Sequence, residues 1–124
     1  MRILSIDSSL GTQLAVVDAA PAATRALQVL SQDEQADTRR HAESLGQMLS
    51  QALSASEAAE RPLDAVVAAT GPAPFTGLRA GLVTAGVVGR TRGVPVHGVS
   101  SLDAVARRAL DELESHEAQT GPVV

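Results

Sequence analysis

Apolar residues near the start of the chain fall in short runs separated by turn residues, a pattern typical of β-strands. Residues 3–6 hold the first run, and residues 14–17 hold the second, after the turn-like sequence SSLGT. Together they predict a β-hairpin. A third run, residues 24–30, follows the loop AAPAA, so we expect three consecutive antiparallel strands.

The spacing of apolar residues changes after the polar stretch SQDEQADTRR. From His41 onward they recur every three or four residues, which predicts an amphipathic helix ending near Ser56. Residues 63–69 indicate a buried strand, and a helix from about Thr76 to Arg90 follows the loop GPAPFTG.

A short strand at residues 94–99 and a last helix complete the pattern. Ser100 or Ser101 can cap this helix, which ends before GPVV. The order βββ-α-β-α-β-α predicts an α/β fold with a five-stranded mixed sheet and helices on its faces. This order resembles one lobe of the duplicated actin-like or ribonuclease-H-like fold.

Composition narrows the chemistry available to these 124 residues. The absence of Cys excludes disulfides, thiolate metal sites and a thiol nucleophile, and the absence of Lys excludes a P-loop lysine or a Schiff base. A net charge of −4 and a single Phe argue against a broad nucleic-acid surface or base stacking. No signal peptide or membrane span is indicated, so we expect a cytoplasmic protein without a membrane partner.

The polar residues do not assemble a recognisable catalytic or metal motif. Asp7 ends the first strand, where it could help to hold a metal ion, but Asp7 and the neighbouring serines could equally satisfy the backbone of their turn, and we favour that interpretation. The three His residues lack metal-ligand spacing, and the nucleophile pattern GxSxG is absent. We therefore predict no catalytic residue, cofactor or metal ion.

Small residues recur every fourth position in the helix that follows the glycine-rich loop. Gly77, Gly81, Ala85 and Gly89 form one ridge, and such a ridge allows another backbone to approach closely. Glycines inside a helix cost about 0.5–1 kcal/mol each relative to Ala, so packing explains them better than anion binding does. The pattern leaves open whether the ridge packs against the chain's own sheet or against another chain.

Four blocks of sequence resemble the bacterial TsaB (YeaZ) family: ILSIDSSLGTQLAVVD, HAESL, AATGPAPFTGLRAGLVTA and VHGVSSLDAVA. They run from about residue 3 to about residue 106 in the family's order, and GP-x-x-FTGLR-x-G is a specific signature. The resemblance implies the N-terminal lobe of an actin-like protein. We accordingly expect that lobe at residues 1–116, and a tail or the start of a missing second lobe at residues 117–124.

The resemblance also implies a function. Family members are dimerisation partners of the related TsaD subunit, which with the ATPase TsaE transfers a threonylcarbamoyl group to the adenosine next to the anticodon of certain tRNAs. We therefore expect a non-catalytic subunit that binds a TsaD-type protein, reaches a TsaE-type ATPase through it, forms a homodimer when alone and contacts tRNA only indirectly. The alternatives are an actin-like ATP-dependent enzyme, supported by the DSSLGT turn, and a protease-like hydrolase, an older label for relatives.

The family's dimer surface is implied to lie on the two long helices of this lobe. His41 could be a helix-entry side chain or an interface contact, and Arg79 could hold an acidic partner group or be solvated. The expected interface comprises His41, Leu45, Met48, Leu49, Gly77, Arg79, Gly81, Ala85 and Gly89.

Overall fold

A computed structural model describes residues 1–19, 27–36, 41–55, 60–73 and 75–120. Its element order is the predicted βββ-α-β-α-β-α. The elements are β1 (Arg2–Asp7), β2 (Thr12–Ala19), β3 (Leu27–Gln35), α1 (His41–Ser54), β4 (Ala65–Ala69), α3 (Phe75–Arg92), β5 (Val96–Val99) and α4 (Ser101–Thr120).

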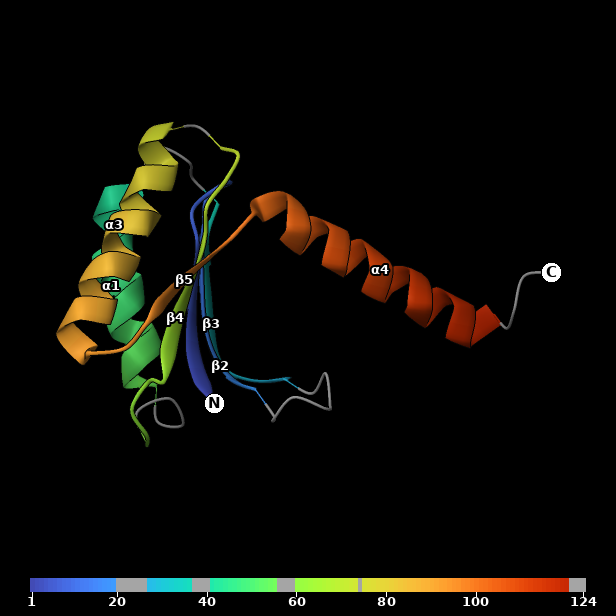
Figure 1. Ribbon diagram of the computed structural model, residues 1–124, viewed down its shortest axis with the longest axis horizontal. Helices are drawn as coiled ribbons and strands as arrows, with labels where there is room; N and C mark the ends of the chain where they lie inside the picture. The colour runs from blue at the N-terminus through green and yellow to red at the C-terminus, as the bar shows by residue number, and fades with distance from the viewer. Residues whose placement is uncertain (20–26, 37–40, 56–59, 74, 121–124) are drawn as a thin grey trace.

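The five strands form one mixed sheet, as predicted, and their order in it is β3-β2-β1-β4-β5. β1 pairs antiparallel with β2 and parallel with β4, and β5 continues the parallel side of the sheet. Consecutive parallel strands need a crossover, and α1 and α3 supply it on the same face of the sheet (Figure 1). The mixed topology therefore follows from a meander joined to two crossovers.

The third strand differs from its prediction. It extends through the polar sequence SQDEQ to Gln35, whereas the expected strand ended at Leu30; the expected start at Thr24 lies outside the described residues. β3 is an edge strand, where polar side chains remain in water while the backbone pairs with β2. The pairing register shifts between Val16 and Val17, which pair with Ser31 and Val29 and leave Leu30 between them as a bulge. Hydrophobic periodicity alone could not reveal a strand of this kind.

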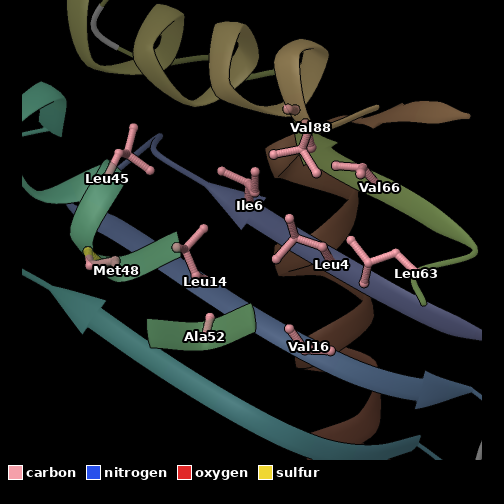
Figure 2. Packing of buried hydrophobic residues seen from close by; sticks show 12 residues of the cluster. Leu4, Ile6, Leu14, Val16, Leu45, Met48, Ala52, Leu63, Val66 and Val88 are labelled. Carbon is pink, nitrogen blue, oxygen red and sulfur yellow. The ribbon is translucent and has the colours of Figure 1, made fainter. Parts of the chain in front are cut away.

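The core lies between the sheet and the two helices α1 and α3 (Figure 2). The alternation of buried and less buried residues in β1 and β2 directs one set of side chains toward the helices. Leu45 and Met48 of α1 lie over Leu14, and Val88 of α3 lies near Val66 in this view. The buried cluster consists of Leu4, Ile6, Leu14, Val16, Leu45, Met48, Ala52, Leu63, Val66, Ala68, Ala85 and Val88.

The last helix leaves the body of the protein. α4 follows β5 and projects away from the sheet, on the side opposite α1 and α3 (Figure 1). It has no extensive contact with any other described element. The domain boundary expected at residue 116 falls inside this helix, which runs to Thr120. In the described part of the chain, no helix is long and apolar enough to cross a membrane.

Candidate partner-binding surface

The small-residue ridge of α3 faces the chain's own sheet. Gly77, Gly81, Ala85 and Gly89 are all buried, and α3 packs on β4, β1 and β5. This answers the question that the sequence leaves open. The close approach that the glycines allow is between a helix and the sheet beneath it, so the ridge itself is not available to another chain in this structure.

Gly81 shows why the ridge needs glycine. Its amide nitrogen donates a hydrogen bond to the Ser8 hydroxyl at 3.2 Å, and that hydroxyl donates to the carbonyl oxygen of Leu78 at 3.3 Å. A Cβ atom at Gly81 would overlap Ser8 Oγ and lie 3.0 Å from Ser8 Cβ. A Cβ at Gly89 would likewise overlap Val96 and lie 3.1 Å from the Val94 carbonyl oxygen. The helix therefore lies against the sheet at a distance that a side chain at these positions would prevent.

The α1 residues expected at the interface lie mostly on its inner side. Leu45 and Met48 are buried in the core, and Leu49 is half-buried beside it. The side chain of His41 lies outside the described residues, so its assignment stays a prediction. Arg79 of α3 is exposed, and it is the member of the expected set that faces solvent.

The outer side of α3 carries an apolar stripe that sequence reasoning missed. Leu82, Val83 and Val87 are 37%, 56% and 57% exposed, and exposed Arg79 and Arg90 lie at either end. A helix that is apolar on both sides is typically covered on both sides. The signal was present in the sequence, because residues 82, 83, 86 and 87 repeat at helical spacing opposite the buried ridge.

Two glycines on the outer side are not required by any contact among the residues that the structure describes. Gly86 on α3 and Gly46 on α1 are exposed, and a Cβ atom at either position would meet no heavy atom within 4 Å. Each glycine nevertheless costs helix stability of about 0.5–1 kcal/mol relative to Ala. The outer side of the α1 and α3 layer thus combines exposed apolar side chains with places where another backbone can come close. We call residues Gly46, Leu82, Val83, Gly86 and Val87 the outer surface.

The loop after β1 uses its polar groups locally. The Asp7 carboxylate accepts hydrogen bonds from the backbone nitrogen of Ser9 at 2.9 Å and from the Ser9 hydroxyl. Ser8 is engaged with α3, as described above. Within the described residues, no group of three or more His, Cys, Asp or Glu side chains could hold a metal ion. The geometry of this loop matches the favoured interpretation that Asp7 and the serines satisfy local polar groups.

A cluster of charged side chains lies at the start of β1, at the end of the strand opposite this loop. The guanidinium of Arg2, only 4% exposed, donates to both carboxylate oxygens of Asp18 at 2.9 and 2.8 Å, and exposed Arg61 donates to Asp18 at 3.2 Å. Hydrogen bonding from Arg2 holds the pKa of Asp18 below its ordinary value of 3.8. Because the Arg2–Asp18 ion pair joins β1 to β2, we interpret this cluster as a structural brace between the two strands.

These observations define a single α/β lobe with an exposed helical surface and, among the described residues, no cluster of side chains that could hold a metal ion. The TsaD family, described as tRNA N6-adenosine threonylcarbamoyltransferase, matches residues 28–124. The match covers more than half of the chain, and the chain therefore belongs to this family.

Individual relatives agree with that assignment. An uncharacterized protein from Mycobacterium tuberculosis is 40% identical over 109 residues, which cover 83% of this chain and 52% of the relative. A tRNA N6-adenosine threonylcarbamoyltransferase from Rhizobium etli is 33% identical over 71 residues, covering 57% of this chain and 20% of that protein. The chain thus spans about half the length of the mycobacterial relative.

The fold is also similar to that of solved structures. YeaZ from Pseudomonas aeruginosa superposes with a TM-score of 0.71 and 25% identity, covering 91% of this chain and 50% of that one. The predicted resemblance to TsaB (YeaZ) and the actin-like, ribonuclease-H-like lobe are confirmed. The chain is built like one lobe of a YeaZ protein.

Proposed function

We propose that this chain is the lobe of a non-catalytic partner subunit in the complex that forms threonylcarbamoyladenosine in tRNA. In this role it binds a TsaD-type subunit, which performs the transfer, and reaches a TsaE-type ATPase only through that subunit. It associates with itself when alone, contacts tRNA indirectly and works in the cytoplasm.

The observation that carries the proposal is the outer surface. Val83 and Val87 expose more than half of their side chains on α3, next to Gly86, which no contact within the chain requires. Exposed apolar residues gathered on one helix face are typical of protein interfaces. Exposed glycines favour close helix packing, because the interaxial distance then falls toward the short end of the usual range of about 8–10 Å.

The non-catalytic part of the proposal is supported by the loop after β1. Asp7 and Ser8 are the polar residues best placed to hold a metal ion or phosphate, and both are engaged in hydrogen bonds to Ser9, Leu78 and Gly81. The competing possibility is an actin-like ATP-dependent enzyme, and the family description names an enzyme, a threonylcarbamoyltransferase. Nucleotide binding separates the two, as set out in the Discussion.

Co-purification with a TsaD-type subunit from the same source tests the proposal. Val83→Glu and Val87→Glu each place a charge on the outer surface without touching the core, so we expect at least a tenfold loss of affinity with little change in unfolding. Ala104→Glu adds the same charge to the exposed polar side of α4 and serves as the matched control. Unchanged binding by both folded valine variants would show that the partner does not use this surface, and no binding by the unmodified chain would remove the proposed function.

A further inference from the structure

Helix α3 is basic although the chain as a whole is acidic. Its charged residues are Arg79, Arg90 and Arg92, and it contains no Asp or Glu, whereas the whole chain has a net charge of −4. Residues 45–54 of α1, the helix packed beside α3, include no charged side chain. The positive charge of this part of the helical layer is therefore concentrated on α3.

Two of these arginines lie in line with the outer surface. An α-helix turns about once every 3.6 residues, so Arg79 and Arg90 are about three full turns apart and project from the same side of α3. Val83 and Val87 follow Arg79 at one and two turns, and they lie on that side as well. The exposed side of α3 is thus apolar in the middle and positively charged at both ends.

Neither of these two arginines is neutralised within the described part of the chain. Arg79 and Arg90 are exposed, and no described residue forms a hydrogen bond or an ion pair with either side chain. The arginines of α4 differ, because Arg107 and Arg108 pair with carboxylates four residues further along their own helix. That helix runs on the opposite side of the sheet (Figure 1). The guanidinium donors beside the outer surface therefore face solvent, where a group from another molecule can accept from them.

We propose that the outer surface selects a partner with carboxylates at both ends of an apolar patch, about three helical turns apart. This inference rests on the proposed function, and the partner is the TsaD-type subunit and not a second copy of this chain. Arginine forms short, bidentate hydrogen bonds with carboxylates. Charges at the edge of an interface determine the choice of partner and the rate of association more than they determine affinity. Val83 and Val87 accordingly supply the contact, and Arg79 and Arg90 decide with whom it is made.

The same arginines disfavour a contact between two identical outer surfaces. In a twofold pair each surface meets its own copy. Antiparallel α3 helices centred on the apolar residues would place Arg79 beside the other copy's Arg90, and parallel helices would place each arginine beside its own equivalent. Like charges meet in both arrangements, which raises the free energy of the pair, whereas a surface with carboxylates at these two positions lowers it. Self-association through the outer surface is therefore the weaker of the two contacts.

Binding to the TsaD-type subunit at two salt concentrations tests the attractive half of the proposal. Between about 50 mM and about 500 mM NaCl, the range over which exposed charges interact shortens about threefold. We expect the unmodified chain to lose at least fivefold in affinity over this change. The double variant Arg79→Glu/Arg90→Glu should bind at least tenfold more weakly than the unmodified chain at the lower concentration, and the difference should shrink at the higher one.

Arg90→Glu and Arg92→Glu form a matched pair for the same measurement. Both arginines lie in the last turn of α3, so both substitutions change the net charge and the interaction with the helix dipole alike. The two side chains project from different sides of the helix, because two residues correspond to more than half a turn. We expect Arg90→Glu to weaken binding at the lower salt concentration at least fivefold more than Arg92→Glu does, with unfolding curves showing both variants to be folded.

Two results would overturn the selection by charge and leave the proposed function standing. One is an equal loss of affinity in Arg90→Glu and Arg92→Glu, which would mean that only overall charge matters. The other is binding that neither salt nor the double variant alters while Val83→Glu weakens it, because the contact would then be apolar alone. A failure of the unmodified chain to bind the TsaD-type subunit at either concentration would instead remove the proposed function, and this inference with it.

Sedimentation of the chain alone tests the repulsive half. Salt screens the repulsion between arginines, so we expect dimers to be sparse at about 50 mM NaCl and more abundant at about 500 mM, opposite to the trend for the TsaD-type subunit. A dimer that weakens with salt and dissociates on Val83→Glu would show that two outer surfaces attract each other through charge. That result would contradict the proposal.

Discussion

The amide nitrogen of Gly81 lies 3.2 Å from the hydroxyl oxygen of Ser8, so α3 is hydrogen-bonded to the loop that follows β1. The same hydroxyl donates to the carbonyl oxygen of Leu78, one turn earlier in the helix. The contact joins residues that are 73 positions apart in the chain. It sets how closely the helix lies on the sheet, and any side chain at position 81 would have to displace Ser8.

We expect Gly81→Ala to destabilise the fold. The methyl group would overlap Ser8 Oγ and force the loop or the helix to move, at a cost of about 1–3 kcal/mol for an overpacked contact. Gly86→Ala is the matched control, since its Cβ enters open space and should stabilise α3 by about 0.5–1 kcal/mol. Urea unfolding of both variants measures the difference, and equal stability of the two would contradict the close contact.

The stabilisation of the fold by the Arg2–Asp18 ion pair should decrease as the pH falls. Because hydrogen bonding from Arg2 lowers the pKa of Asp18 in the folded chain, the contribution is complete above the ordinary value of 3.8 and is lost as pH falls through the lower folded pKa. We expect Asp18→Asn to melt earlier than the unmodified chain at pH 7, and the gap to shrink in acid.

Arg61→Gln is the control for that experiment. Arg61 is 68% exposed and adds one hydrogen bond to Asp18, whereas Arg2 is almost fully buried and forms an ion pair with this carboxylate. We therefore expect Arg61→Gln to lower the melting temperature far less than Asp18→Asn does. A gap between Asp18→Asn and the unmodified chain that stays constant down to pH 2 would show that the carboxylate charge is not responsible.

Helix α4 should be unusually sensitive to its first residues. Ser100→Ala removes the hydroxyl that caps the Leu102 N–H and should weaken the helix by about 1 kcal/mol. Amide hydrogen exchange along α4 measures this, with faster exchange expected in the first turn. Ser115→Ala, at an exposed position in the same helix, should leave that turn protected; equal acceleration in both variants would point to a general loss of helix and not to the cap.

Titration with ATP and Mg²⁺ tests whether this chain acts through a nucleotide. Asp7 and Ser8 belong to the DSSLGT turn on which the ATP-dependent alternative rests, and they are engaged with Ser9 and α3. We expect no saturable heat at micromolar concentrations. A dissociation constant near 1 µM, equivalent to about −8 kcal/mol, would favour the ATP-dependent alternative over the non-catalytic subunit.

Much of the fold could be predicted from the sequence, because its strands and helices have clear hydrophobic periods. The apolar runs that predicted β1, β2 and β4 contain Leu4, Leu14 and Val66, and all three side chains lie in the hydrophobic core. The strand β3 was misjudged because Asp33 and Glu34 pair their backbones at a sheet edge while their side chains remain in solvent or half-buried. Polarity is a poor guide to structure at an edge.

The surface was harder to predict than the fold. A row of small residues such as Gly81 and Ala85 signals close packing, but the row itself does not say what packs there, and here it is the chain's own sheet. The exposed Val83 and Val87 look like core residues when only their hydrophobicity is considered. Deciding between the two sides of α3 required knowing which one meets β4, and that depends on contacts distant in sequence.

The backbone of Gly71 joins two helices that are otherwise apart. It follows β4 and precedes α3, and it exchanges two hydrogen bonds with Ser101 at the start of α4. Gly71 therefore connects the start of the 20-residue helix α4 to the segment that leads into α3. A molecule that moved α4 would therefore strain these two hydrogen bonds, close to the segment that leads into the helix carrying Val83 and Val87.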